Sequence, residues 1–306
     1  MVNILITGGA GNIGSTLADT LAKDKNNHII IADNLLSGSK SKVPKKKNVH
    51  FIKCDVNDYR DISALFFHYN FKYVFHYAAV VGVKRTLAKP LLVLNDIKGI
   101  ENILKLSKNT GVKRVFYSSS SEVYGEPVEL PQHEQTTPLN SRLPYAIVKN
   151  LGESYFKAYQ QEYNLDYTIF RFFNTYGKNQ STDFVIPRFI KAATQNKPIT
   201  IYGDGSQSRT FLHVDDNVDV CIKALAENKL INDTLNIGND KEYTIKELAK
   251  IIINLTNSKS KIIYAPPLPE GDMTRRCPDI SKMKNLLNRD LINLKHGIKR
   301  ILELKK

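Results

Sequence analysis

The run Val2-Asn3-Ile4-Leu5-Ile6-Thr7-Gly8-Gly9-Ala10-Gly11-Asn12-Ile13-Gly14 decides the fold of this chain. A short apolar segment ends directly in a loop with glycine at positions 8, 11 and 14, and a helical pattern follows. The glycines allow a tight turn, a close approach to a pyrophosphate and close packing of helix against strand. The helix N-terminus adds N–H donors and a favourable dipole. One glycine loop is a weak signal, but this strand–loop–helix context predicts a dinucleotide site.

Short apolar runs alternate with segments of helical periodicity along the first half of the chain. The predicted strands are Val2–Thr7, His28–Ala32, Val49–Cys54, Tyr73–Tyr77, Arg114–Ser118 and Tyr167–Phe172. The predicted helices between them are Ile13–Lys23, Asp61–Tyr69, Leu91–Asn109 and Tyr145–Tyr163. This alternation implies right-handed crossovers, and the near-continuous apolar strands are typical of a sheet buried on both faces. The sequence therefore predicts an α/β fold with a Rossmann-type doubly wound parallel sheet.

The rhythm of strand and helix breaks after Gly177. Turn signals become frequent, while helices such as Asp215–Glu227 and Thr244–Leu255 follow without regular strands between them. We expect residues 1–176 to form the NAD-binding Rossmann domain. Residues 177–306 are expected to form mainly a smaller α/β lobe, interleaved with the first domain, that binds substrate at the carboxyl edge of the sheet.

Acidic residues at the ends of two predicted strands indicate which dinucleotide is bound. Asp33 ends the second strand, about where a carboxylate receives the adenosine ribose hydroxyls. A carboxylate there repels a 2′-phosphate, and no arginine stands beside it in the sequence, so we predict NAD rather than NADP. Asp55 ends the third strand, where an adenine amino group can be met.

Composition narrows the classes of partner. Hydrophobic residues make up 42% and charged residues 24% of the chain, which is ordinary for a globular protein. No apolar run reaches membrane-spanning length, and the first residues lack the features of a signal peptide. The three cysteines have no metal-ligand spacing, so we expect free thiols, no metal and a cytoplasmic location.

The formal net charge of +14 attracts anions in general. The longest basic clusters, Lys40–Lys47 and Lys299–Lys306, have no interleaved aromatic residues that could stack on bases. This pattern favours a solvated surface over nucleic-acid binding, and we expect neither a nucleic acid nor a membrane as partner.

Two further segments carry candidate chemistry. In Tyr145-Ala146-Ile147-Val148-Lys149 a tyrosine and a lysine are four residues apart, on one face of a predicted helix. A neighbouring ammonium and a positively charged nicotinamide both lower the pKa of a phenol toward the range of a useful base. The pattern alone is common on solvated helices. The segment Ser118–Gly125 sharpens it, because it adds hydroxyls and a carboxylate at the carboxyl end of a predicted strand.

The order and spacing of these motifs resemble the extended short-chain dehydrogenase/reductases. Within them, the chain is similar to the nucleotide-sugar epimerase/dehydratase group, which includes UDP-glucose 4-epimerases and UDP-glucuronate decarboxylases. The segments that carry the resemblance are Thr7–Gly14, His76–Ala79, Ser118–Gly125, Tyr145–Lys149, Arg171–Asn174, Tyr202–Arg209, Gly271–Asp272 and Arg276–Asp279.

The resemblance implies roles for individual residues. Tyr145 would be the acid/base, and Lys149 would lower its pKa and bind the nicotinamide ribose. Ser120 would hydrogen-bond the sugar O4, with Glu122 beside it. Asn174 would contact the sugar or diphosphate, Arg209 the diphosphate and Tyr202 the base. Ser121 and Arg276 complete the implied substrate contacts. The implied cofactor contacts are Gly8, Gly11, Asn12, Ile13, Gly14, Asp33, Asn34, Asp55, Val56, Tyr77, Ala78, Ala79, Tyr145, Lys149 and Phe172.

The resemblance also implies a reaction class and an assembly. Oxidation at sugar C4 gives a 4-keto sugar that is epimerised, dehydrated or decarboxylated, while NAD stays bound. The partner would be a nucleotide sugar, most consistently UDP-linked. The protein would be a homodimer that uses Leu91–Asn109 and Tyr145–Tyr163 in a helix bundle.

The residues favour two of these three reactions. Dehydratases of the group carry an acidic pair after the Ser/Thr, and Ser121-Glu122 has only one carboxylate. Glu122 and Arg276 match decarboxylases, whereas Ala146-Ile147-Val148 follows the epimerase form. We therefore predict a UDP-sugar (hexose or hexuronate) 4-epimerase, with UDP-glucuronate decarboxylase as the alternative.

Three points remain open at this level. A non-catalytic NAD-binding regulator is disfavoured because Ser120, Tyr145 and Lys149 are all retained. Arg276 is expected to bind either a sugar carboxylate or the diphosphate. Asp96 stands where the group usually has Asn, and Pro269 stands where it often has Arg.

Overall fold

A computed structural model describes residues 1–267 and 273–304 of the chain. Its centre is a seven-stranded sheet in the order β11-β6-β5-β4-β1-β2-β3, in which every paired neighbour is parallel. The strands are β1 (Val2–Thr7), β2 (Asn27–Asp33), β3 (Val49–Lys53), β4 (Tyr73–His76), β5 (Arg114–Ser120), β6 (Asp166–Phe172) and β11 (Asp233–Ile237). The predicted doubly wound sheet is confirmed, and all six predicted strands lie within two residues of their expected bounds.

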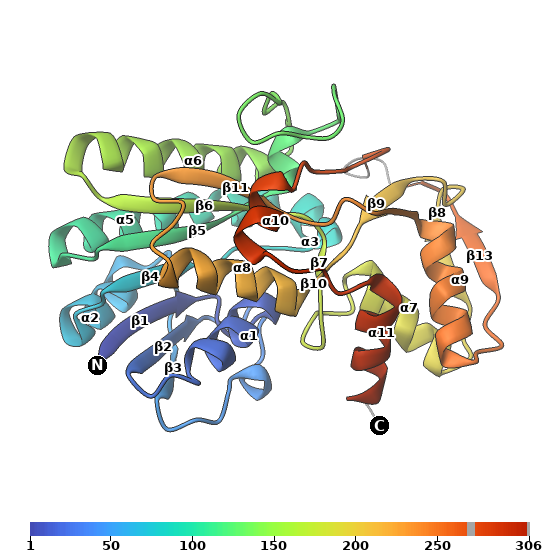
Figure 1. Ribbon diagram of the computed structural model, residues 1–306, viewed down its shortest axis with the longest axis horizontal. Coiled ribbons are helices and arrows are strands. Elements are labelled where there is room, and N and C mark those ends of the chain that lie inside the picture. Colours follow the sequence, from blue (N-terminus) through green and yellow to red (C-terminus); the bar gives the residue numbers. More distant parts are fainter. Residues whose placement is uncertain (268–272, 305–306) are drawn as a thin grey trace.

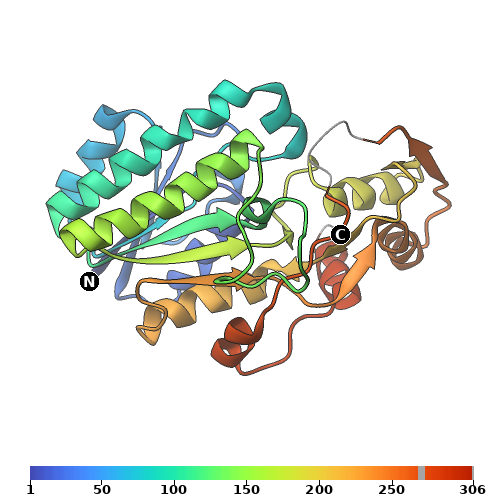
Figure 2. The ribbon, with the colours of Figure 1, turned by 90° about the horizontal axis from the view of Figure 1, so that it is seen from above.

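Two helical layers cover this sheet (Figures 1 and 2). The first-face helices are α2 (Tyr59–Tyr69), α5 (Asp96–Thr110) and α6 (Pro144–Tyr163), whose apolar residues pack in one buried cluster. The second-face helices are α1 (Asn12–Leu21), α8 (Val214–Ala226) and α10 (Ser281–Leu287), which share another buried cluster. The continuous apolar strands predicted this burial on both faces.

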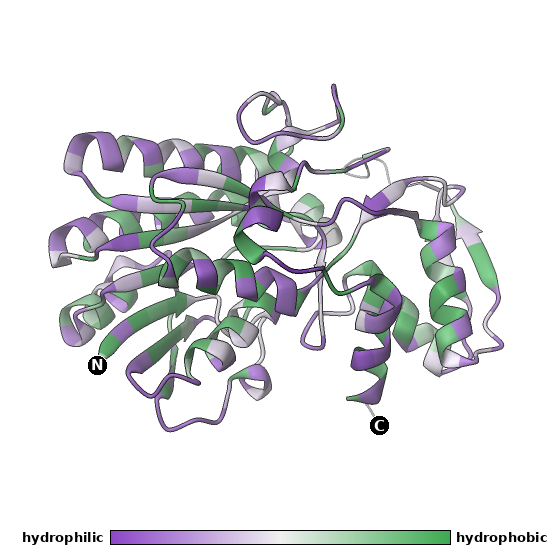
Figure 3. Cartoon of the chain, viewed as in Figure 1, coloured by the Kyte–Doolittle hydropathy of each residue, from purple (hydrophilic) through white to green (hydrophobic). Residues whose placement is uncertain are grey.

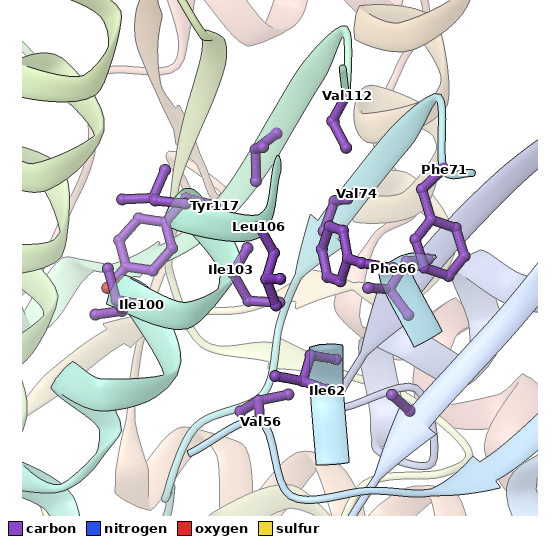
Figure 4. Packing of buried hydrophobic residues seen from close by; sticks show 14 of the residues in the cluster. Val56, Ile62, Phe66, Phe71, Val74, Ile100, Ile103, Leu106, Val112 and Tyr117 are labelled. Carbon is purple, nitrogen blue, oxygen red and sulfur yellow. The ribbon is translucent and has the colours of Figure 1, made fainter. Parts of the chain in front are cut away.

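Side chains from α2 and α5 meet the sheet in the first of these clusters (Figure 4). Ile62 and Phe66 of α2 and Ile103 of α5 are buried completely or nearly so, as is Val74 of β4. In Figure 3 most of β1 has the colour of hydrophobic residues, whereas hydrophobic and hydrophilic positions alternate along α6. The helices therefore pack an apolar face against the sheet, as amphipathic helices do.

The order in which the chain adds strands to the sheet reverses between the neighbouring strands β1 and β4. From β1 the chain continues to β2 and β3 on one side, and from β4 to β5 and β6 on the other. The loops after β1 and β4 therefore diverge at the carboxyl edge and leave a crevice there, where folds of this type bind ligands.

The expectation that the helices after Gly177 follow without regular strands between them is wrong, because six strands lie between Ile199 and Ala265 and one of them joins the large sheet. Strand β11, with the sequence Asp-Thr-Leu-Asn-Ile, pairs with β6 and completes the sheet. Polar residues interrupt its apolar pattern, and its partner lies more than 60 residues earlier in the chain. Residues 177–306 thus contribute to both parts of the molecule, and the division at residue 176 stays a prediction.

One predicted helix also differs from the structure. The expected helix Leu91–Asn109 is two helices, α4 (Pro90–Leu94) and α5, joined at Asn95. Pro90 begins α4, and a short helix α3 (Val83–Ala88) precedes it. Two short 3₁₀ helices, η1 (Lys40–Lys42) and η2 (Ser121–Tyr124), lie in loops at the same carboxyl edge of the sheet.

The smaller lobe lies beyond the carboxyl edge of the sheet (Figure 1, right). Its helices are α7 (Val185–Thr194), α9 (Ile245–Thr256) and α11 (Leu294–Glu303), and a third buried cluster joins them. Its strand pairs are β7 (Thr175–Tyr176) with β10 (Leu212–His213), β8 (Ile199–Tyr202) with β13 (Ile262–Ala265), and β9 (Ser208–Thr210) with β12 (Glu242–Thr244). Among the helices of residues 1–267 and 273–304, none has the length and apolar character needed to cross a bilayer.

Candidate active site

A cavity of about 400 Å³ lies between the carboxyl edge of the sheet and the smaller lobe. The glycine loop after β1 lines one end, and Tyr145 and Arg276 line the other. The volume is within the range of small-molecule sites. One continuous cavity therefore joins the two groups of motifs that the sequence set apart.

The glycine loop has the shape of a pyrophosphate cradle. Gly8 has a φ of 68°, and a Cβ there would lie 2.7 Å from the backbone of Tyr77 and Ala78. A Cβ on Gly14 would lie 2.6 Å from the Gly8 carbonyl oxygen. Only glycine fits at these two positions, and the loop leads directly into the N-terminus of α1. These residues fit a dinucleotide whose pyrophosphate rests on the loop.

Asp33 stands at the adenosine side of this cradle. It is 7% exposed, and its carboxylate accepts hydrogen bonds from the N–H of Ala10 at 3.0 Å and of Leu35 at 2.8 Å. Nearby, the Asn34 side-chain amide donates to Asp55 at 3.3 Å. Lys42, which the sequence argument missed, lines the same end of the cavity. Burial lowers the pKa of Lys42, and attraction to Asp33 opposes that shift.

The residues predicted to contact the cofactor all line this cavity. They are Gly8, Gly11, Asn12, Ile13, Gly14, Asp33, Asn34, Asp55, Val56, Tyr77, Ala78, Ala79, Tyr145, Lys149 and Phe172. They come from the ends of β1, β2, β3, β4 and β6 and from the first turns of α1 and α6. Their contacts with a bound cofactor stay a prediction.

The candidate acid/base lies at the start of α6. Pro144 is the first residue of that helix, which places Tyr145 in its first turn and Lys149 one turn later. The Ser120 hydroxyl, at the end of β5, is hydrogen-bonded to Tyr145. The Lys149 ammonium lies 5.8 Å from the centre of the Tyr145 ring and donates to the Ser118 carbonyl oxygen at 2.6 Å. The three predicted groups therefore meet at one end of the cavity.

Burial shifts both titrating groups of this pair. It raises the pKa of Tyr145, and the charges of Glu122 and Asp96 act in the same direction. The hydrogen bond with Ser120 lowers the pKa of Tyr145 but does not offset the burial. The upward shift holds for the protein without its cofactor, because desolvation penalises the phenolate more than the Ser120 hydrogen bond favours it. Lowering of this pKa by Lys149 and a bound oxidised nicotinamide stays a prediction. Burial also lowers the pKa of Lys149 to about 8, opposed by Asp96 and Glu153.

A buried ion pair fixes the elements that carry these groups. Glu153 of α6 and Arg171 of β6 approach to 2.6 Å, and both side chains are at most 3% exposed. The Ser119 hydroxyl of β5 donates to the same Glu153 at 2.5 Å. These contacts join β5, β6 and α6 behind the cavity. The sequence argument had placed Arg171 in a motif without a role and had not singled out Glu153.

A second ion pair lies inside the cavity. The two terminal nitrogens of Arg276 donate to the two carboxylate oxygens of Glu122 at 2.7 and 3.1 Å. One of these nitrogens also lies 3.4 Å from the Ser121 hydroxyl, and Arg276 is 3% exposed. The Arg276 Nε has no hydrogen-bond partner among the described residues. The structure thus brings together two residues that are 154 positions apart.

The remaining predicted substrate contacts divide into two groups. Asn174 lines the cavity with a φ of 25°, and its buried amide nitrogen has no hydrogen-bond partner within the described part of the chain. Tyr202 and Arg209 are not among the residues that line this cavity. Pro269, named above as a departure, lies outside the described residues.

Several lining residues gave no signal in the sequence argument. Phe184, Ile186 and Phe211 bring apolar surface from the smaller lobe. Arg85 reaches from the segment after β4 to Asp183, with an ion-pair distance of 3.0 Å. These side chains reach the cavity only through the packing of the two lobes, which no local pattern reports. Within residues 1–267 and 273–304, no group of His, Cys, Asp and Glu side chains has an arrangement that could hold a metal ion.

Comparisons with known proteins agree with this geometry. The family model described as NAD dependent epimerase/dehydratase family matches residues 4–238. A UDP-N-acetyl-alpha-D-glucosaminuronate decarboxylase of Bacillus cytotoxicus is 38% identical over 298 residues, which cover 92% of this chain and 90% of that relative.

Two crystal structures share the fold over nearly the whole chain. A UDP-glucose 4-epimerase from Thermotoga maritima, solved with UDP-glucose, has a TM-score of 0.93 and 31% identity and covers 99% of this chain and 98% of its own. A UDP-glucuronic acid 4-epimerase from Bacillus cereus, solved with UDP-glucuronic acid and NAD, has a TM-score of 0.90 and 27% identity. It covers 99% of this chain and 100% of its own.

The family model extends from β1 through β11, the whole of the seven-stranded sheet and its loops. It therefore includes the glycine cradle, Ser120 and the Tyr145–Lys149 pair. The cofactor that fits this cradle, with Asp33 beside it, is NAD. By its matched model, its relatives and its site, the chain belongs to the NAD dependent epimerase/dehydratase family.

Proposed function

We propose that this protein is an NAD-dependent UDP-sugar 4-epimerase of the cytoplasm. The observation that carries the proposal is the meeting of Ser120, Tyr145 and Lys149 in the cavity that the glycine cradle opens into. An acid/base pair beside a dinucleotide site is the equipment that reversible oxidation of a sugar hydroxyl needs. The two epimerases compared above were solved with UDP-glucose and with UDP-glucuronic acid.

The residues divide the work of the reaction between them. Bound NAD supplies the chemistry of accepting a hydride from sugar C4 and returning it. Tyr145 takes the proton from the sugar O4 and later gives it back to the same oxygen. Ser120 holds that oxygen and the phenol in one hydrogen-bonded arrangement. Lys149 binds the nicotinamide ribose, and its positive charge favours the phenolate form of Tyr145.

The rest of the cavity is assigned to the UDP-sugar. Asn174, whose amide nitrogen is buried without a partner among the described residues, is suited to a sugar or diphosphate oxygen. Ser121 and Arg276 line the same cavity, and we assign them to the sugar. We assign Arg209 to the diphosphate and Tyr202 to the base, on the family resemblance. These assignments make residues 177–306 the main source of the substrate-binding lobe.

A second candidate reaction is decarboxylation of a UDP-hexuronate. Glu122 and Arg276 favour it, because both match decarboxylases and the Arg276 Nε, without a partner among the described residues, is a donor suited to a sugar carboxylate. A 4-keto group beside such a carboxylate acts as an electron sink for loss of CO₂. The decarboxylase relative of Bacillus cytotoxicus is consistent with this second reaction.

One experiment tests the proposal and separates the two reactions. The purified protein is incubated with UDP-glucose, UDP-N-acetylglucosamine and UDP-glucuronate, and the products are identified by mass and NMR. We expect products of unchanged mass with an inverted C4. Loss of about 44 mass units, from UDP-glucuronate only, would replace epimerisation by decarboxylation. Bound NAD without turnover on any of the three would instead indicate a non-catalytic role.

We also propose that the protein is a homodimer. Leu91 and Leu94 of α4 and Leu151 of α6 are 81%, 37% and 38% exposed, and Ile147 of α6 is 45% exposed. Figure 2 shows α5 and α6 side by side along one outer face of the molecule. An exposed apolar row on adjacent helices favours a helix bundle with a second copy of the chain.

A further inference from the structure

A second, much smaller cavity lies directly behind the candidate acid/base. Its volume is about 10 Å³, and its apolar lining comes from Ala78, Ala79, Ile100 and Val148. Its polar lining consists of His76, Asp96, Tyr117, Tyr145 and Lys149. We call it the rear chamber. Asp96 and Lys149 line both this chamber and the main cavity, as Tyr145 does, so both residues lie near Tyr145.

Three carboxylates influence the Tyr145–Lys149 pair, and two of them have a guanidinium partner. Glu122 is paired with Arg276 at 2.7 Å, and Glu153 with Arg171 at 2.6 Å. Asp96 is instead held by neutral donors. Its carboxylate accepts from the Val80 N–H at 2.7 Å and from the Asn57 side-chain amide at 3.4 Å. Asp96 therefore has no guanidinium partner among the described residues.

Lys149 is the complementary case. It is 3% exposed, and the hydrogen bonds it donates go to the carbonyl and hydroxyl oxygens of Ser118, which are neutral. Its ammonium also lies 4.9 Å from the centre of the Tyr117 ring. A buried ammonium with neutral acceptors loses hydration without gaining a counter-charge nearby. Attraction to Asp96 is the largest of the effects that raise the pKa of Lys149 against burial.

The other groups around the chamber supply little charge of their own. Burial holds the pKa of His76 at about 3, and its Nδ1 lies 2.9 Å from the Thr7 hydroxyl, so this imidazole is neutral at physiological pH. Burial raises the pKa of Tyr117 well above its ordinary range. Burial raises the pKa of Asp96 and Asp55 acts in the same direction, whereas the hydrogen bonds from Val80 and Asn57 and the charge of Lys149 oppose this shift. The charged groups that act on Tyr145 and Lys149 are thus Asp96 from α5, Glu122 from η2 and Glu153 from α6.

We propose that Asp96 is a positioning residue whose carboxylate, across the rear chamber, is the counter-ion of Lys149 and tunes the Tyr145–Lys149 pair as one unit. This inference rests on the roles proposed above for Tyr145 and Lys149. The hydrogen bond from the Val80 N–H holds the Asp96 carboxylate in place. Val80 itself follows Ala78 and Ala79, which line the cavity. The proposal makes a signed prediction: removal of one nearby negative charge makes both an ammonium and a phenol more acidic.

The test is the pH profile of kcat/KM for Asp96→Asn. Asparagine keeps the shape and can still accept from the Val80 N–H, so a structural role leaves both limbs of the profile in place. The charge role instead moves both limbs to lower pH, by roughly half to one pH unit. Glu162→Gln is the matched control, since it removes one exposed carboxylate from α6, and its profile stays where it was. Unmoved limbs in Asp96→Asn overturn the proposal.

A second readout needs no turnover. Urea unfolding is measured for Asp96→Asn, Lys149→Met and the double variant at neutral pH. We expect Asp96→Asn to lower the urea midpoint when Lys149 is present, because it strands a buried ammonium. In the Lys149→Met background the same change is neutral or raises the midpoint. Equal effects in both backgrounds overturn the proposal. If the unmodified protein turns over no UDP-sugar, the proposed function fails, and this cycle still decides the pairing.

Discussion

Tyr145 is the residue on which the proposed chemistry depends most. Burial raises its pKa above that of a free phenol, so the protein alone keeps it protonated. The hydrogen bond with Ser120, the Lys149 ammonium and the positive charge of oxidised nicotinamide act in the opposite direction. We therefore expect Tyr145 to accept a proton only when the cofactor is oxidised, which is when the sugar has a proton to lose.

Tyr145→Phe keeps the ring and removes the oxygen that titrates. We expect turnover of the UDP-sugar substrate to fall by about two to four orders of magnitude, the usual contribution of a positioned general base. Content of bound NAD and the thermal unfolding midpoint should be unchanged, because the ring still fills its place. Tyr159→Phe, on the same helix, is the control. Near-normal turnover of the Tyr145 variant would end its assignment as acid/base.

At the same scale, we expect Asp33 to decide the choice of dinucleotide. Asp33→Ala leaves the N–H groups of Ala10 and Leu35 without their acceptor and removes the contact to the ribose. We expect NAD binding, measured by calorimetry on protein freed of cofactor, to weaken by about 1–3 kcal/mol. Lys42→Met tests the neighbouring cation separately. NADP binding by the unmodified protein as tightly as NAD would contradict the assignment of Asp33.

A variant of Arg276 distinguishes two proposed ligands of this residue, a carboxylate of the sugar and the diphosphate. The two terminal nitrogens of Arg276 pair with Glu122, and its buried Nε has no hydrogen-bond partner among the described residues, so Nε is the donor left for a substrate anion. We expect that anion to be a carboxylate of the sugar. Arg276→Leu should then abolish activity on a UDP-hexuronate while any UDP-hexose activity persists. Comparable losses on both substrates, mainly in KM, would indicate binding of the diphosphate instead. The double variant Arg276→Leu with Glu122→Gln removes the unpaired carboxylate and serves as the control.

At the scale of the element, the loop between β1 and α1 has the least freedom to change. It passes so close to the loop after β4 that the backbone of Tyr77 and Ala78 limits the space at Gly8. The loop geometry is therefore set by two strands at once, and the helix that follows points its N-terminus at the same place. We expect a dinucleotide to bind there without any rearrangement of the sheet.

Gly14→Ala tests this arrangement. The added methyl would lie 2.6 Å from the Gly8 carbonyl oxygen and 2.8 Å from the Gly9 Cα, so the loop or the helix must move. We expect purified protein to lose most of its NAD and the unfolding free energy to drop by about 1–3 kcal/mol. Thr20→Ala, less than two turns further along α1, is the control and should retain NAD. Full NAD content in Gly14→Ala would show that the loop does not hold the pyrophosphate as proposed.

At the scale of the whole molecule, the cavity exists because two lobes meet over the carboxyl edge of one sheet. The large lobe supplies the cradle and the acid/base pair, whereas Asn174, Phe211 and Arg276 come from the segments that continue into the smaller lobe. The chain crosses between the lobes repeatedly, since β11, α8 and α10 return to the sheet. Neither lobe contains the whole site.

The proposed homodimer is a prediction at this scale. Replacement of both Leu91 and Leu151 by Glu places charge in the exposed apolar row of α4 and α6, and we expect light scattering after gel filtration to give the mass of one chain. Phe67→Glu is the control, because Phe67 is 70% exposed on α2, away from this row. If the unmodified protein already has the mass of one chain, the helix-bundle dimer is wrong.

The sequence alone determined the features that depend on local pattern. The apolar runs predicted six parallel strands, the glycine spacing predicted the cradle, and Asp33 at the end of a strand predicted the dinucleotide. Each of these follows from residues within about ten positions of one another, because the periodicity of a strand or helix and the φ of a glycine are local properties. The resemblance of the motifs then supplied Ser120, Tyr145 and Lys149, all of which line the cavity.

Only the tertiary structure decided what depends on neighbours distant in sequence. It added β11 to the sheet, although polar residues hide that strand, because pairing with β6 rather than its own pattern makes it a strand. It joined Glu122 to Arg276 and placed Asp96 and Lys149 around one small chamber. It also gave the pKa shift of Tyr145 a sign that the Tyr–Lys spacing had not predicted. Desolvation and charge are sums over everything packed around a group, and a linear spacing contains only two members of that sum.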